Sequence, residues 1–158
     1  MKNLKIKDIF LSVLSAILLI LSFPRIDFSF LVWIALIPLM LALENKKKVE
    51  AFWLSYFCGV IFFAGTLYWF IYVDILVAWV GAPLLVLYLA LYFGLFGFMV
   101  SAFHQTRLCF RLILLPAGWV ILEWIRAHFL TGFSWVSLSH SQYRNLPLIQ
   151  IADTTGIF

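Results

Sequence analysis

Charged side chains are scarce in this sequence. Asp, Glu, Lys and Arg make up 11% of the 158 residues, whereas hydrophobic residues make up 65% and the mean hydropathy is +1.08. A soluble domain of this length carries about twice as much charge. The composition therefore excludes a soluble protein and indicates an integral membrane protein, in which apolar runs of about 20 residues cross the bilayer as helices.

Residues that bind metals or act as nucleophiles are also few. Cys58 and Cys109 lack a CxxC partner, so we interpret both as packing residues, with a disulfide or a nucleophilic role as the less favoured alternatives. His104, His128 and His140 lack the HxxxH and HExxH spacings of metal sites. We therefore expect no metal and no cofactor.

The motifs of several common enzyme classes are missing as well. The sequence contains no GxSxG elbow, no P-loop and no GxGxxG motif. Glu123 is the lone carboxylate of its hydrophobic segment, which leaves it without a partner for a carboxylate dyad. The residues alone therefore do not establish an enzyme, and we assign no catalytic residue.

Positive charge is present, but it flanks hydrophobic segments, which is typical of membrane topology rather than of nucleic-acid binding. With a cytoplasmic N-terminus, the inner loops hold eight Lys and Arg residues and the outer loops hold two. This bias predicts a cytoplasmic N-terminus and an outward-facing tail over residues 131–158. The inner residues are Lys2, Lys5, Lys7, Lys46, Lys47, Lys48, Arg107 and Arg111, and the outer ones are Arg25 and Arg144.

Hydrophobic segments divide the chain and predict an all-α fold, a polytopic transmembrane helical bundle. The first two are short and are joined only by Pro24–Asp27, which predicts a helical hairpin. Residues 1–158 are predicted to form one transmembrane domain. Its approximate helices cover residues 9–23, 28–43, 51–72, 83–103 and 112–130.

Small residues recur four positions apart in the third and fourth segments. The pairs are Ser55 with Gly59, Ala90 with Gly94, and Gly97 with Ser101. Such spacing lets the backbones of membrane helices approach closely, so it predicts tight helix packing within the chain.

The fifth segment carries two opposite charges, Glu123 and Arg126, which lie three residues apart on one helix face. An ionised group at bilayer depth costs about 2.5–3.5 kcal/mol on insertion scales, so it needs a partner or a function. Two interpretations stay open. The residues form a structural ion pair, or they mark a site for a lipid headgroup, since arginine suits phosphate.

The stretch after this segment is rich in turn-forming and aromatic residues. It reads Thr131-Gly-Phe-Ser-Trp135 and is followed by Ser141-Gln142. Aromatic rings favour the membrane–water boundary. We therefore predict an interfacial turn, with Gly132, Phe133, Trp135 and Gln142 as its candidate residues.

These residues also carry a resemblance. The strings Glu123-Trp-Ile-Arg126, Thr131-Gly-Phe-Ser-Trp135 and Ser141-Gln142 resemble the E-W-L-R, T-G-F-P-W and G-Y-S-Q strings in the membrane region of bacterial apolipoprotein N-acyltransferase. Two earlier stretches agree, Leu21-Ser-Phe-Pro24 and Gly65-Thr-Leu-Tyr-Trp69. The chain departs from the family at Ser134, which replaces proline, and at Ser139-His140, which replaces Gly-Tyr.

The resemblance implies an N-terminal transmembrane domain of a transferase for lipoprotein biosynthesis in the bacterial inner membrane. It implies transfer of a phospholipid acyl chain to the N-terminal diacylglyceryl-cysteine of a lipoprotein, by a ping-pong route through a cysteine thioester. The partners would be membrane lipids and a lipoprotein substrate, with no nucleic acid.

In this family a nitrilase-like domain with a Glu–Lys–Cys triad follows the membrane helices, and this sequence does not contain it. Neither Cys58 nor Cys109 matches the family's nucleophile. We therefore expect a fragment that is inactive on its own. The alternative function is a non-catalytic polytopic scaffold or a small transporter subunit, although the paired broken helices of transporters are missing. The sequence does not indicate an oligomeric state.

Overall fold

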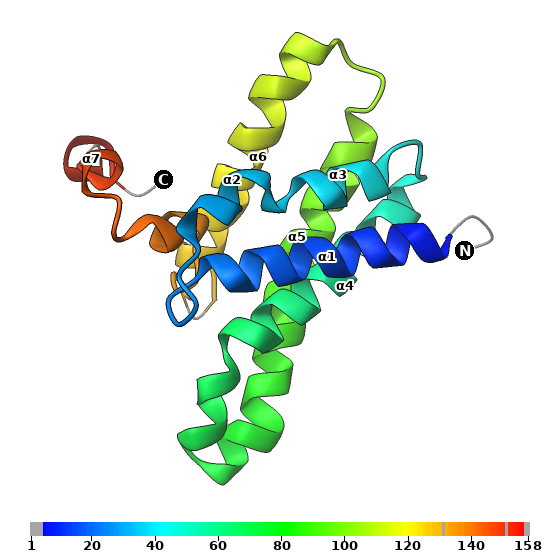
Figure 1. Ribbon diagram of the computed structural model, residues 1–158. Coiled ribbons are helices and arrows are strands. Elements are labelled where there is room, and N and C mark those ends of the chain that lie inside the picture. The colour runs from blue at the N-terminus through cyan, green and yellow to red at the C-terminus, as the bar shows by residue number, and fades with distance from the viewer. Residues whose placement is uncertain (1–4, 131, 151, 157–158) are drawn as a thin grey trace.

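The computed structural model in Figure 1 describes residues 5–130, 132–150 and 152–156. Every regular element in these ranges is helical, which confirms the predicted all-α class. The longer helices are α1 (Ile6–Ser22), α3 (Ile37–Leu43), α4 (Lys48–Thr66), α5 (Ala82–Ala102) and α6 (Leu108–His128). The shorter elements are η1 (Ser29–Leu31), α2 (Val32–Ala35), η2 (Tyr68–Tyr72), the π-helical turn η3 (Val77–Gly81), η4 (Leu138–Gln142), α7 (Leu146–Ile149) and α8 (Ala152–Thr155).

Three helical stretches are long and apolar enough to cross a membrane, namely Lys48–Thr66, Ala78–Ala102 and Leu108–His128. Their outer faces are apolar as well. On α5, exposed leucines recur every three or four residues, so they form one stripe. Apolar surface of this extent suits contact with lipid chains. The stripe consists of Leu84, Leu87, Leu91 and Leu95.

Helices α4 and α5 lie side by side and are joined by a hairpin, drawn in green in Figure 1. A Cβ atom at Gly97 would lie 2.1 Å from Ser55 Oγ and 2.5 Å from the Ala51 carbonyl oxygen. At Gly59 it would lie 3.1 Å from the Cα atom of Ala90. The close packing predicted from the small residues is therefore confirmed.

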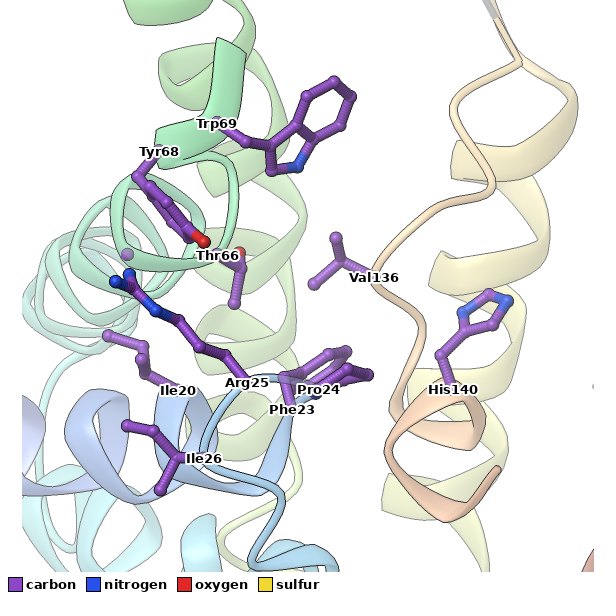
Figure 2. Close-up of a pocket in the computed structure, with 11 residues that line it drawn as sticks. Ile20, Phe23, Pro24, Arg25, Ile26, Thr66, Tyr68, Trp69, Val136 and His140 are labelled. Carbon is purple, nitrogen blue, oxygen red and sulfur yellow. The ribbon is translucent and has the colours of Figure 1, made fainter. Parts of the chain in front are cut away.

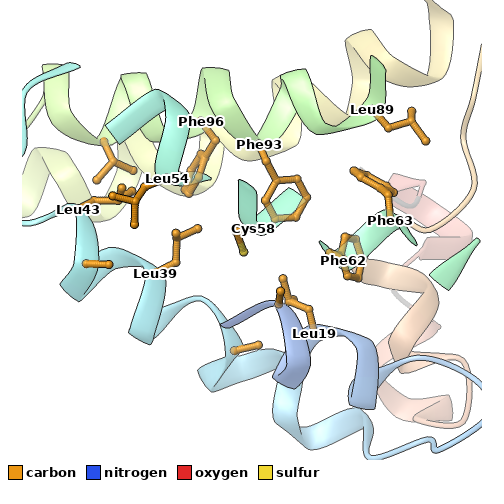
Figure 3. Packing of buried hydrophobic residues seen from close by; sticks show 14 of the residues in the cluster. Leu19, Leu39, Leu43, Leu54, Cys58, Phe62, Phe63, Leu89, Phe93 and Phe96 are labelled. Carbon is orange, nitrogen blue, oxygen red and sulfur yellow. The ribbon is translucent and has the colours of Figure 1, made fainter. Parts of the chain in front are cut away.

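Helix α1 crosses this pair, and the core lies between them (Figure 3). The rings of Phe62, Phe63 and Phe93 meet with centroids 5.0–5.7 Å apart. Two serines of α1 add polar contacts between helices, since Ser12 Oγ donates to the Leu54 carbonyl at 2.9 Å and Ser15 Oγ to the Ala35 carbonyl at 2.6 Å. Such hydrogen bonds help to hold membrane helices together.

The expected helix over residues 28–43 is divided in the structure. Helix α2 ends at Ala35, Leu36 forms a turn, and α3 begins at Ile37. The cause is Pro38, which has no N–H to donate to the carbonyl of Ile34. The segment 51–72 likewise ends its α-helix at Thr66 and continues as a 3-10 turn over Tyr68–Tyr72.

Helix α6 begins at Leu108, four residues before the expected start at 112, and Pro116 lies inside it. This first part of α6 leaves its side chains exposed, with Leu108 and Phe110 more than half accessible. The packing interpretation therefore holds for Cys58, which is fully buried, but it is wrong for Cys109, which is exposed on the first turn of α6.

Candidate functional site

The candidate residues lie where α6 ends and the chain turns back along the bundle. Helix α6 ends at His128, and the next residue is extended. Gly132 then takes a positive φ of 61°, and its N–H donates to the Phe129 carbonyl at 3.1 Å. A left-handed conformation suits glycine because it has no Cβ. This glycine therefore allows the chain to reverse direction after the helix.

Glu123 and Arg126 are both buried, with 8% and 3% of their surface exposed. Their closest charged atoms, Glu123 Oε1 and Arg126 Nη2, are 3.9 Å apart, which is too far for a hydrogen bond. Each has a closer partner in the following segment. Glu123 Oε1 accepts the backbone N–H of Leu138 at 2.9 Å, and Arg126 Nη2 donates to Ser137 Oγ at 3.0 Å.

Ser137 connects this pair to the start of η4. Its hydroxyl accepts from Arg126 and donates to the Ser134 carbonyl at 3.2 Å. Its backbone N–H donates to His140 Nδ1 at 3.1 Å. The hydrogen bonds of Glu123 and Arg126 join Ser137 and Leu138, at the start of η4, to α6.

Two buried donors of this region have no hydrogen-bond partner among the described residues, Arg126 Nε and Trp119 Nε1. They line a cavity of about 10 Å³ together with Tyr92 and Glu123. That volume is close to the space that one water molecule occupies. The Trp119 ring itself packs edge-on against Phe93 at 5.0 Å and so joins α6 to α5.

Three of the four residues of the predicted interfacial turn lie together, since the Phe133 and Trp135 rings pack with centroids 5.7 Å apart and line one cavity with Gly132, whereas Gln142 lies elsewhere. Phe133 also packs against the core, and Trp135 is 54% exposed, with its ring 5.5 Å from the Trp69 ring. Gln142 is buried and donates from Nε2 to the Ser29 carbonyl at 2.7 Å. Gln142 thus joins η4 to the beginning of the second segment, and Trp135 packs against Trp69 of η2.

The structure also contains a contact between two loops that sequence reasoning missed. Arg144 Nη1 lies 2.7 Å from Asp27 Oδ2, which also accepts a hydrogen bond from Tyr143 at 3.1 Å. Both charges stand in loops that the charge distribution places on one side of the membrane. Their opposite signs were therefore the available signal for this pairing.

The fold and this site define an α-helical membrane protein of several spans, whose buried charges organise the chain at one end of the bundle. Residues 15–158 match the model of the apolipoprotein N-acyltransferase N-terminal domain. The chain belongs to this family, as the resemblance predicted.

Several curated relatives support this assignment. An apolipoprotein N-acyltransferase of Geobacter metallireducens is 42% identical over 96% of this chain and 30% of its own length. A relative from Chlorobaculum tepidum is 31% identical over 96% of the chain and 29% of its own length. Another from Chromobacterium violaceum is 35% identical over 77% of the chain and 26% of its own length. The chain thus spans less than a third of the length of these relatives.

Proposed function

We propose that this chain is the membrane portion of an enzyme that transfers a phospholipid acyl chain to the N-terminal amine of diacylglyceryl-cysteine lipoproteins. The observation that carries the proposal is the family match over residues 15–158. The thioester step belongs to the nitrilase-like domain that the resemblance places after this region in full-length relatives. We assign no catalytic role to the residues of this chain.

The role of the membrane helices follows from the lipid nature of both substrates. They hold the catalytic domain at the membrane surface and admit the two lipid substrates sideways from the bilayer. The charge bias of eight Lys and Arg residues against two supports a cytoplasmic N-terminus. In a bacterial inner membrane this orientation places the end of α6 and the tail on the periplasmic side.

For Glu123 and Arg126 we propose the structural role. Both are buried, Arg126 Nη2 donates to Ser137 Oγ, and Glu123 Oε1 accepts the N–H of Leu138. A headgroup site needs an arginine that reaches the lipid with its planar fork free. The burial of Arg126 and its contact with Ser137 support the structural role over a headgroup site.

Photochemical crosslinking tests the admission of the lipoprotein substrate. The chain is reconstituted in phospholipid vesicles and exposed to a photoreactive diacylglyceryl-cysteine lipopeptide. We expect the labelling to be saturable. The unlabelled lipopeptide should abolish it by competition, whereas the same peptide without its diacylglyceryl group should leave it unchanged. Labelling that rises without saturation, or that the competitor leaves unchanged, contradicts a substrate-admitting role for these helices.

A further inference from the structure

A pocket of about 380 Å³ lies at the end of α4, between the turn after α1 and the segment after α6 (Figure 2). One part of its wall is apolar and includes Ile20, Phe23 and Val136. The other part carries polar groups of Arg25 and Tyr68. A site for a small ligand typically has this size and this mixture of surfaces.

Arg25 is the cation of this pocket. Its guanidinium lies 4.7 Å from the centroid of the Tyr68 ring, a stacking contact that holds the side chain against η2. Among the described residues it forms no ion pair, because Asp27, two positions further on, is paired with Arg144 instead. The guanidinium therefore keeps its hydrogen-bond donors for a ligand. The backbone holds Arg25 at a φ of 140°, a conformation that residues with a side chain rarely adopt.

A second polar residue lines the pocket on the side opposite the Arg25 guanidinium (Figure 2). This residue is His140, and its Nδ1 accepts the N–H of Ser137 at 3.1 Å. Arg25 and His140 come from the turns after α1 and α6, so the fold brings two distant segments to one pocket.

The depth of the pocket indicates its ligand. Thr66 lines the pocket and is the last residue of α4, one of the helices that can cross a membrane. The end of such a helix lies at the boundary between hydrocarbon and headgroups. Tyr68 and Trp69, which also line the pocket, are residue types enriched at that boundary. A molecule bound here has its polar part in the headgroup layer and its apolar part beside α1.

We propose that this pocket binds a bilayer phospholipid, with its phosphate on Arg25 and the first part of an acyl chain against Phe23 and Trp69. The planar guanidinium matches a phosphate with two parallel hydrogen bonds. The inference concerns binding alone. It can hold even if acyl transfer does not occur, because it depends on residues of this chain and on no catalytic group.

The test is phospholipid binding to the purified 158-residue chain in detergent, followed by native mass spectrometry. The probes are a short-chain phosphatidylglycerol, the diacylglycerol with the same chains, and inorganic phosphate. Arg25→Gln should lower the affinity for the phospholipid about tenfold, because it removes a charge-assisted pair of hydrogen bonds. It should leave diacylglycerol binding unchanged.

The matched control is Arg107→Gln, the same change just before α6. Helix α6 is about 30 Å long, and the segment that lines the pocket follows its other end. It should lower phospholipid affinity less than twofold. Arg25→Lys keeps the charge but loses the planar fork, so its phospholipid affinity should lie between those of the wild-type chain and Arg25→Gln. This variant replaces Arg25→Gln in the comparison if the glutamine variant does not fold. Equal losses for the Arg25 and Arg107 variants, or no loss at Arg25, overturn the proposal. Inorganic phosphate that binds as tightly as the phospholipid also overturns it, because the site would then recognise a small anion.

Discussion

At the scale of single residues, Glu123 and Arg126 show how a buried charge is retained in an apolar helix. The two charged atoms are 3.9 Å apart, so their mutual attraction alone does not account for the site. Each also binds a polar group of the chain that returns after α6. The charges are therefore stabilised by a small network that includes Ser137 and the backbone of Leu138.

Arg126→Gln should lower the free energy of unfolding by about 2–3 kcal/mol, because the Glu123 carboxylate stays buried without its cation. The double variant with Glu123→Gln should recover at least half of that loss. Thermal unfolding in detergent measures both, with the exposed change Arg107→Gln as the control. If Arg126→Gln left the free energy of unfolding unchanged, the structural role proposed for this residue would be contradicted. If Arg126 bound a headgroup instead, the single change would weaken phospholipid binding and spare stability.

Asp8 gives a prediction about pH, and it lies just before the apolar segment 9–23. Burial raises the pKa of its carboxyl, but hydrogen bonds from the Lys46 side chain and the Lys5 backbone N–H outweigh burial, so the pKa falls below its ordinary value of 3.8. A lowered pKa in the folded state stabilises the fold above pH 3.8, and this stability is lost as the pH falls through the lower, folded-state value. Asp8→Asn should therefore destabilise the chain at pH 7 and flatten the acid limb of its stability curve. An unchanged acid limb in thermal melts from pH 7 to pH 2 would exclude this contribution.

At the scale of elements, the contact between α4 and α5 depends on the absence of side chains. Gly97→Val should destabilise the chain by about 1–3 kcal/mol, because its Cβ would overlap Ser55 and the Ala51 carbonyl. Ala64→Val adds bulk on the exposed part of α4 and should have an effect within about 0.5 kcal/mol. Thermal unfolding compares the two variants. Equal stability of the two variants would contradict a close contact between α4 and α5 at Gly97.

The elements also show how far sequence reasoning reached. Long apolar runs predicted the helices, and the spacing of Gly59 and Gly97 predicted their close packing, because both features depend on local pattern. The early start of α6 was missed because Pro116 suggested a helix beginning, although a proline inside a membrane helix is tolerated.

Within the candidate site, the sequence singled out Glu123 and Arg126 but not the groups that they bind. A loop serine such as Ser137 and a backbone N–H such as that of Leu138 have no distinguishing pattern. Their roles depend on a chain reversal that only the folded structure defines. The break after α2 could have been predicted from Pro38, whose missing N–H was not taken into account.

At the scale of the whole molecule, the charge bias predicts the direction in which the helices cross the membrane. Single cysteines at Lys47 and Tyr72, placed before and after α4 in a Cys109→Ser background, should react with an impermeant maleimide from opposite sides of the membrane. Lys47 should be the cytoplasmic one, because it belongs to the lysine cluster. Tyr72 is 82% exposed, so labelling is not limited by burial. Labelling of both positions from one side would contradict the crossing of α4.

Acyl transfer by a chimera tests the central claim, that this chain is the membrane portion of an N-acyltransferase. Residues 1–158 are fused to the part of the Geobacter metallireducens relative that follows the aligned region. The purified chimera is then incubated with phospholipid and a diacylated lipopeptide. The controls are the chain alone, the relative's part alone, and a chimera whose nucleophilic cysteine is replaced by alanine. We predict that only the intact chimera yields triacylated lipopeptide, as measured by mass. A folded chimera without product, or product from the chain alone, would contradict the proposed division of roles.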